Sequence, residues 1–244
     1  MKYFWLSLTL VLTTALTAYS QTATFSGRVT EQNTGVAIPN VAVVALGNQT
    51  GTRVAITDAQ GNFTIPIGAN NNIKLRAYRT NFVFNPLQVI FVSIGAPVSG
   101  PQSQDFTGTA LPFPIFIVAQ EPILLTEDNS LKALSVDSVT YQRDPLSLLN
   151  NNYFGADKRT RITLLLVDLE LFSGETLSII TAQAIDHSLV SHNLTVEDLR
   201  KVPGLPWLSQ LTVMLPSDLV GPDELSVSVS LRGKTSNAAT IRIQ

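Results

Sequence analysis

Apolar and polar residues alternate with a period of two along much of the chain, which is the pattern of strands that bury one face. Residues 73–78 place three apolar side chains on one face, and residues 225–232 alternate four large apolar residues with three serines and an arginine. Residues 239–243 alternate in the same way and predict the second arm of a terminal hairpin. Residues 41–46 are apolar on both faces, as in a strand at the middle of a sandwich. The pattern predicts an all-β chain.

A turn between two apolar runs is predicted near residue 60. Asp58 can accept hydrogen bonds from the backbone that follows it, Gly61 can take a positive φ, and Phe63 restarts a strand with its ring inward. Asp58, Gln60 and Asn62 also carry side-chain oxygens at alternate positions, an arrangement that can wrap a calcium ion. Calcium sites use several carboxylates and this segment has one, so the sequence favours the plain turn over a metal site.

The first 20 residues have the features of a secretory signal peptide. Lys2 precedes an apolar run over residues 3–16, and two small residues, Ala18 and Ser20, occupy the positions that signal peptidase reads. The apolar core of about 12 to 14 residues is short for a membrane-spanning helix, which needs about 20. We expect cleavage after Ser20 and export of the mature chain, with a retained membrane anchor as the alternative.

The rest of the chain is long enough for two domains of ordinary size. We expect a first β-sandwich over residues 22–110, a linker over residues 111–123 and a second sandwich-like module over residues 124–244. Prolines interrupt the apolar stretch between Leu111 and Leu125, so this stretch suits a linker that merges into a strand and cannot form a membrane helix. The predicted fold is two tandem immunoglobulin-like or prealbumin-like β-sandwich domains.

Five segments follow one another along the first predicted domain: FSGRV at 25–29, IPNVAV at 38–43, TDAQGNF at 57–63, YRTNFVFNP at 78–86 and DFTGT at 105–109. Together they resemble the carboxypeptidase regulatory-like module of bacterial secreted proteins. The resemblance covers nearly the whole predicted domain. It implies a seven-stranded sandwich that accompanies enzymes and surface proteins and has no catalytic residues of its own.

Four segments mark the second predicted domain: NNYFGADKRTR at 151–161, TAQA at 181–184, VPGLPWLSQ at 202–210 and SN at 236–237. They are similar to an uncharacterised C-terminal β module that recurs on exported proteins of soil bacteria. The likeness spans roughly 100 residues of the chain. It implies a structural or display-related role and no activity.

Residues 162–171 differ from the other predicted strands because both faces are apolar over the first half. Ile162, Leu164 and Leu166 lie together on one of these faces and need a cover. The rest of the same sandwich, a domain interface or a homodimer would each supply it. Because the loop 150–160 adds asparagines, a glycine and basic residues beside this face, the three residues are the candidate partner surface.

Charge and cysteine content exclude several classes of function. Only 14% of the residues are charged and the formal net charge is −2. Without Lys2 the chain has 15 basic and 18 acidic residues, a net charge of −3. The densest basic stretch, 158–161, follows Asp157, so no nucleic-acid-binding face is expected. The absence of cysteine excludes disulfides, thiolate metal sites, a cysteine nucleophile and a lipid-carrying cysteine.

Catalytic chemistry has little support in the residue pattern. His187 and His192 are five residues apart, and on a strand they would point to opposite faces, which makes a poor metal pair. Residues 186–188 contain the Asp, His and Ser of a triad, but neighbours on a strand also point to opposite faces. Nucleophile-elbow, phosphate-loop and dinucleotide motifs are missing from the sequence. We expect no catalytic residue, no metal, no cofactor and no enzyme activity.

The leading functional prediction is a non-catalytic exported protein that acts in adhesion, envelope structure or display. Its expected partner is a protein or polysaccharide of the cell envelope, and its expected place is the medium, the periplasm or the cell surface. The first alternative is a carbohydrate-binding accessory protein, and the second is a hydrolase whose carboxylates come from distant strands. Trp207 suits either a core plug or a sugar-stacking platform. The candidate exposed aromatic residues are Tyr78, Tyr141, Tyr153 and Trp207.

Overall fold

A computed structural model describes residues 22–111, 120–151 and 156–244 of the chain. Within these ranges the chain forms strands, turns and a short 3-10 turn, η1 (Leu177–Ile179), so the predicted all-β class is confirmed. The described part contains no helix that is long and apolar enough to cross a membrane. The predicted signal peptide and most of the predicted linker lie outside the described residues.

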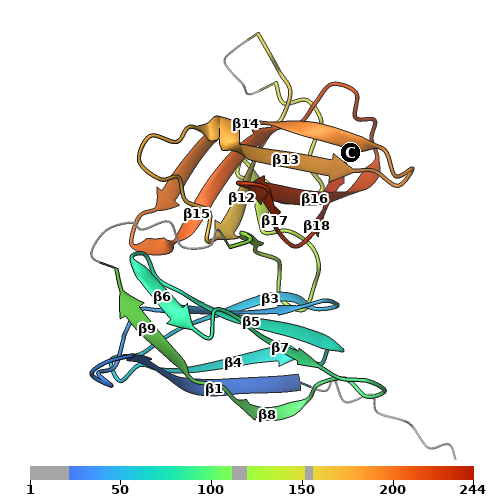
Figure 1. Cartoon of the computed structure of the whole chain (residues 1–244). Coiled ribbons are helices and arrows are strands. Elements are labelled where there is room, and N and C mark those ends of the chain that lie inside the picture. The colour runs from blue at the N-terminus through green and yellow to red at the C-terminus, as the bar shows by residue number, and fades with distance from the viewer. Residues whose placement is uncertain (1–21, 112–119, 152–155) are drawn as a thin grey trace, which may run out of the picture.

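The N-terminal half of the chain is a sandwich of two sheets, in blue and green in the lower part of Figure 1. Apolar side chains from both sheets meet between them, with Phe25, Ile73 and Phe106 fully buried. The first sheet contains β1 (Thr22–Glu31), β4 (Asn62–Gly68), β6 (Phe82–Asn85), β8 (Gly100–Ser103) and β9 (Phe106–Ala110). The second contains β2 (Ala42–Gly47), β3 (Gly51–Ile56), β5 (Asn72–Tyr78) and β7 (Val89–Val92).

The C-terminal half forms one sheet that folds over itself into two layers. The sheet bends at β14, because the first residues of this strand pair with β13 and its remaining residues pair with β15. A register shift between Val196 and Asp198 accompanies this change of partner. The strands are β10 (Ile123–Leu124), β11 (Ser135–Asp137), β12 (Arg161–Val167), β13 (Ile180–Ile185), β14 (Ser191–Val202), β15 (Leu205–Met214), β16 (Asp223–Leu231), β17 (Lys234–Thr235) and β18 (Ala239–Ile243).

Several strands occupy the positions that their residue patterns predict. β2 is central, because it pairs with β3 on one side and with β5 on the other. Val43 and Ala45 of β2 face the interior of the N-terminal sandwich, whereas Val44 faces the C-terminal half, which explains why both faces are apolar. β16 buries Leu225 and Val227 and pairs with β18, so the predicted terminal hairpin is confirmed.

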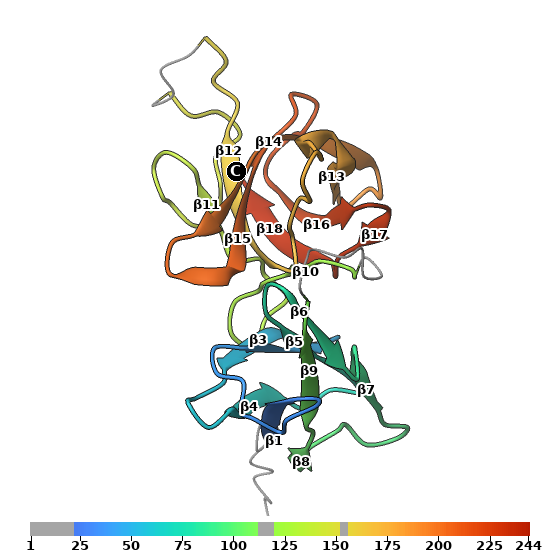
Figure 2. The ribbon, with the colours of Figure 1, turned by 60° about the vertical axis from the view of Figure 1, so that its left-hand side comes forward.

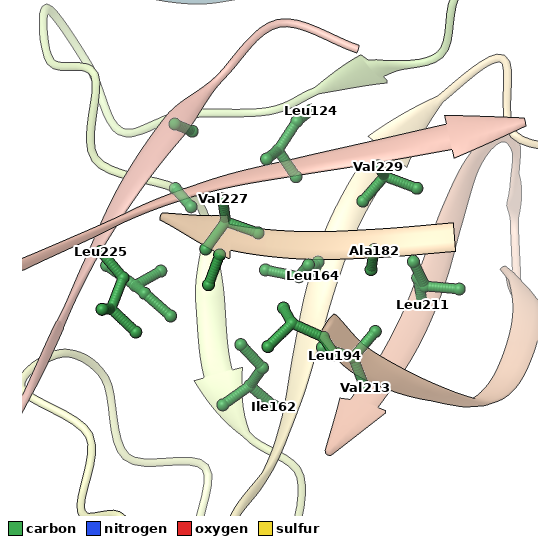
Figure 3. Close-up of a cluster of buried hydrophobic side chains, with 14 of the residues drawn as sticks. Leu124, Ile162, Leu164, Ala182, Leu194, Leu211, Val213, Leu225, Val227 and Val229 are labelled. Carbon is green, nitrogen blue, oxygen red and sulfur yellow. The ribbon is translucent and has the colours of Figure 1, made fainter. Parts of the chain in front are cut away.

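The strand predicted over residues 162–171 is shorter than expected. β12 ends at Val167, because Asp168 has a left-handed φ of 60° that a strand does not tolerate. Its apolar residues Ile162, Leu164 and Leu166 are 0% exposed and belong to the core of the C-terminal half. Figure 3 shows Ile162 and Leu164 among side chains of both layers. The sandwich itself covers this face, which corrects the expectation of a partner surface, since a side chain without exposed area cannot contact another chain.

Candidate functional site

The two halves meet at the outer face of the sheet that contains β2, and both views of the ribbon show them stacked there (Figure 2). Val44 of β2 is 1% exposed and packs against apolar residues of β12 and β15. The second apolar face of β12, with Leu165 and Val167, is thus the face that another sandwich covers. We call this group the junction cluster: Val44, Val54, Tyr78, Ile123, Leu125, Leu134, Leu165, Val167, Val202, Trp207 and Leu208.

Two threonines exchange hydrogen bonds across the junction. The backbone N–H of Thr52 donates to Oγ1 of Thr126 over 2.8 Å, and the backbone N–H of Thr126 donates to Oγ1 of Thr52 over 2.8 Å. Gly51, with a φ of 70°, brings the chain close enough for this exchange, because a Cβ there would overlap the backbone oxygen of Ser130. The exchange fixes the position of one half on the other.

Arg76 is a buried cation on the face of β5 that meets the C-terminal half. Its guanidinium contacts the carboxylate of Asp168 and donates to the carbonyl oxygen of Glu121 over 2.6 Å. Lys74, on the same face, donates to the carboxylate of Glu121 over 3.0 Å. Burial raises the pKa of Asp168, and the Arg76 charge opposes that rise. Because a buried cation without partners is costly, these contacts bind the C-terminal half to β5.

Tyr78 completes the polar part of the junction at the end of β5. Its hydroxyl donates to Oε2 of Glu170 over 3.0 Å, and Nζ of Lys201 donates to the Tyr78 hydroxyl over 3.4 Å. Nζ of Lys201 also lies 3.6 Å from Oε2 of Glu170 and 5.7 Å from the centre of the Tyr78 ring. Burial and the nearby Glu170 charge raise the pKa of Tyr78. The phenol therefore stays neutral, and its hydroxyl forms hydrogen bonds with Glu170 and Lys201 of the C-terminal half.

A groove of about 310 Å³ opens beside these contacts. The β5–β6 turn lines it from the N-terminal half, and the segment after β12 lines it from the C-terminal half. Leu111 and Gln120 also line it. Its aromatic lining residues are Tyr78, Phe82, Phe84 and Phe172. Its charged lining residues are Arg79, Asp168, Glu170 and Arg232.

Arginines are stacked on two of the aromatic rings in the groove wall. The Arg232 guanidinium carbon lies 3.7 Å from the centre of the Phe172 ring, and Nε of Arg232 donates to Oε1 of Glu175 over 2.7 Å. The Arg79 guanidinium carbon lies 4.8 Å from the centre of the Phe82 ring. Rings and guanidinium planes hold one another in place, and the wall presents apolar and hydrogen-bonding atoms side by side. Such a mixture suits a sugar or peptide ligand.

The two carboxylates among the groove's described lining residues are Asp168 and Glu170. An acid with a raised pKa beside an ionised carboxylate is the chemistry of a glycosidase. Each carboxylate is engaged at the junction, however, Asp168 by Arg76 and Glu170 by Lys201 and Tyr78. Because both serve to hold the halves together, the arrangement favours binding over proton transfer.

Residues 186–188 form the turn between β13 and β14, so the expectation based on alternation along a strand is corrected. Nδ1 of His187 lies 2.8 Å from Oδ2 of Asp223, and Nε2 lies 3.2 Å from Oγ of Ser188. These are the contacts of a Ser-His-Asp triad, with Asp223 in place of the sequence neighbour Asp186. The His187 side chain is 75% exposed and does not line the groove. Because water reaches the His187 ring freely, the arrangement suits a structural contact between the turn and β16 better than catalysis.

His192 is buried between two carboxylates at the same end of the C-terminal half. Its Nε2 lies 3.1 Å from Oδ2 of Asp186, and its Nδ1 lies 3.0 Å from Oδ2 of Asp218. Both ring nitrogens need a proton to donate to both acids, and these hydrogen bonds raise the pKa of His192. The two histidines therefore have separate partners. Within the described ranges no group of three His, Asp or Glu residues is arranged to hold a metal.

The other predicted aromatic candidates lie in three different situations. Trp207 is half-buried in the junction cluster, so it fills space between the halves instead of forming a free platform. Tyr141 is 75% exposed and does not line the groove. Tyr153 lies outside the described residues. Tyr78 is thus the predicted candidate that reaches the groove.

The segment weighed for calcium is a turn held by its own backbone. Oδ1 of Asp58 accepts hydrogen bonds from the backbone N–H groups of Gln60 over 2.9 Å and of Asn62 over 2.8 Å. Gly61 has a φ of 78°. The predicted turn is confirmed, with Asp58 as its cap.

Sequence reasoning missed the groove, because its residues come from segments that are far apart in the chain. Arg76 alternates with the apolar residues of β5 in the sequence, yet it is buried as well, with 4% of its surface exposed. The available signal was the apolar outer face of β2, which required a cover beyond its own sandwich. Nothing in the local pattern pointed to Phe172 or Arg232.

A scan of protein-family models and a search of curated proteins found no match to this chain. Among solved structures, BcpA, the major pilin subunit of Bacillus cereus, is similar over 92% of this chain and 70% of its own, with 7% identity and a TM-score of 0.29. A streptococcal ancillary pilin is similar over 73% of this chain and 60% of its own, with 11% identity and a TM-score of 0.29. The Escherichia coli adhesin FdeC is similar over 93% and 65%, with 9% identity and a TM-score of 0.28. Similarity at this level carries no argument about function, which rests on the chain's own residues.

Proposed function

We propose that the protein is an exported, non-catalytic protein that acts in adhesion, envelope structure or display. The observation that carries the proposal is the junction, where apolar packing, the Thr52–Thr126 exchange and the Arg76–Asp168 ion pair join two sandwiches. A junction of this kind transmits mechanical load from one sandwich to the other and holds a binding surface in a fixed orientation. Enzymes that close around a substrate need the opposite, a hinge between their domains.

The placement of the recognised segments supports the two module assignments. In the N-terminal half, residues 25–29 lie on β1, residues 57–63 form the turn into β4, and residues 105–109 lie at the start of β9. We assign this half to the carboxypeptidase regulatory-like modules and the C-terminal half to the uncharacterised exported β modules. Both assignments imply a supporting or display role, in line with the signal peptide expected over residues 1–20.

Labelling of intact cells tests this proposal. An antibody against the C-terminal half is applied to whole cells and, in parallel, to cells opened by detergent. If the protein is displayed, whole cells bind the antibody as well as opened cells do, and external protease removes the signal. A signal that appears only after the inner membrane is opened would contradict export.

Carbohydrate binding is the second candidate, and the groove favours it specifically. Glycan sites place sugar rings against aromatic faces and satisfy hydroxyl groups with charged side chains. The groove has aromatic residues from both halves and the four charged residues named above. Its volume of about 310 Å³ fits one or two sugar rings.

Titration with envelope polysaccharide tests the groove. Phe82→Ala removes a ring from the groove wall, and Tyr141→Ala removes an exposed ring outside the groove as a matched control. Binding to the groove predicts that Phe82→Ala weakens affinity about tenfold, the loss typical of one stacking contact, while Tyr141→Ala changes nothing. If the wild type and both variants bind the polysaccharide with equal affinity, the groove is not the binding site. Shortening of the polysaccharide during the titration would instead support the hydrolase alternative, with Asp168 and Glu170 as its acids.

A further inference from the structure

Strand β7 forms an outer edge of the second N-terminal sheet. It pairs with β5 alone among the described strands, so one row of its backbone N–H and C=O groups has no strand beside it. Val89 and Phe91 point into the sandwich, where the Phe91 ring lies 4.8 Å from that of Phe25. Ile90 and Val92 point to the opposite face and are 48% and 65% exposed.

Strand β7 itself has none of the features that usually protect an edge, and the nearest prolines, Pro86 and Pro97, lie outside it. No charged residue occurs between Arg79 and Asp105, and β7 contains no proline. Ile94, just beyond the strand, is 99% exposed. Charges, prolines and bulges are what natural proteins place on edges to prevent pairing with another chain. An apolar, uncharged edge is therefore suited to pairing.

The other outer strands of the N-terminal half are protected. β4 contains Pro66, β8 contains Pro101, and β6 is followed directly by Pro86. β3 is tied to the C-terminal half through Thr52. Among the described outer strands of this sandwich, β7 is therefore the one without such protection.

We propose that β7 pairs antiparallel with β7 of a second copy of this chain. Antiparallel pairing of identical strands follows a two-fold axis, so each copy gives and receives the same contacts. A pair centred on Phe91 sets Ile90 of one copy opposite Val92 of the other and keeps both on the same face. The two four-stranded sheets then become one continuous sheet, and the free backbone groups gain partners.

The face that carries Ile90 argues for a second copy as the occupant. In the register of the sheet, Val44 of β2 lies opposite Arg76 of β5, and Lys74 of β5 lies opposite Ile90 of β7. Residues directly opposite one another point to the same face, so the exposed residues of β7 continue the face on which the C-terminal half is already packed. A strand added here must be apolar and uncharged to match Ile90 and Val92. β7 itself meets this requirement and is present wherever the protein is.

Sedimentation velocity of the purified exported protein over a range of concentrations tests the proposal. The wild type should pass from the mass of one chain to that of two as concentration rises. Val92→Lys, at an exposed position opposite Asn72, should keep the mass of one chain throughout with an unchanged melting temperature. Val220→Lys is the matched control, since Val220 is 79% exposed but lies outside the strand, and it should dimerise like the wild type. A wild type that stays single, or dimers of Val92→Lys, would overturn the proposal.

Disulfide trapping gives an independent reading, because the chain has no cysteine of its own. The variant Ile90→Cys with Val92→Cys places thiols opposite one another across the proposed pair. Mild oxidation should yield a crosslinked dimer that a reductant separates. Val220→Cys, treated in the same way, should yield little. Crosslinking that is equal for both variants would mean random collision and would contradict pairing through β7.

Discussion

Arg76 of β5 and Asp168, the residue that follows β12, form an ion pair that joins the two halves of the protein. The side chain of Arg76 is 5% exposed and that of Asp168 is 23% exposed. The left-handed φ of Asp168 ends β12, and the Asp168 side chain contacts Arg76 on β5. One residue therefore links the local end of a strand to the packing of one half on the other.

Breaking this ion pair from one side should destabilise the protein. Arg76→Met leaves Asp168 partly buried without its cation, and we expect a loss of about 3 to 5 kcal/mol in the free energy of unfolding by urea. Arg76→Met with Asp168→Asn should lose less, because no charge is stranded and asparagine tolerates the left-handed backbone. Arg143→Met, which removes a 69% exposed arginine, is the control and should change little. A single variant as stable as the wild type would mean that the pair contributes nothing.

Truncation of Leu164 should have the effect of a core cavity. Leu164 is 0% exposed between the layers of the C-terminal half, so Leu164→Ala should cost about 2 to 5 kcal/mol of unfolding free energy. Leu149→Ala removes the same atoms from a 65% exposed residue and should cost less than about 0.5 kcal/mol. Similar losses from the two variants in thermal melts would place Leu164 outside the core.

Stability should fall as pH rises through the titration of His192. The folded state raises the pKa of His192 above 6.5, so the contribution is complete below about pH 6.5 and is lost above the raised value. The lowered pKa values of Asp186 and Asp218 set the acid limit, since their contribution is lost as pH falls below 3.8 through those values. Unfolding by urea at a series of pH values measures both slopes. His192→Asn should flatten the alkaline slope, and an unchanged slope would assign it to another group.

The predicted domain boundary leads to a test of each half alone. Limited proteolysis should cut within residues 111–123 and leave two fragments, because prolines there prevent continuous sheet pairing. Each fragment exposes its part of the junction cluster, so each should melt below the intact chain. Circular dichroism of the separate fragments measures this. Fragments without strand signal would show that the two halves share one folding unit.

Local pattern predicted the strands well where burial has a period of two. β5, β16 and β18 have the expected apolar faces, and the turn capped by Asp58 has the expected hydrogen bonds. These features depend on neighbours in the sequence. The strand through residue 171 was overestimated, because apolar spacing continues past Asp168 while the backbone does not.

The candidate site was harder to predict, because it depends on how two sandwiches are placed. The apolar face of Leu165 and Val167 did imply a second cover, but the sequence could not tell which face of β12 meets the other half. Asp223 joins His187 across the fold from 36 residues away. Tyr78 was noted for its ring, and its place in the groove follows from Glu170, which is 92 residues away.

The most direct test of the central claim measures binding and turnover in one sample. The purified exported protein is incubated with the envelope fraction of the producing cells, which is then sedimented, and bound protein and released soluble sugar and peptide are both assayed over time. A non-catalytic surface protein predicts saturable binding with no release of soluble material. Time-dependent release would show an enzyme, and protein that stays entirely in solution would exclude an envelope partner.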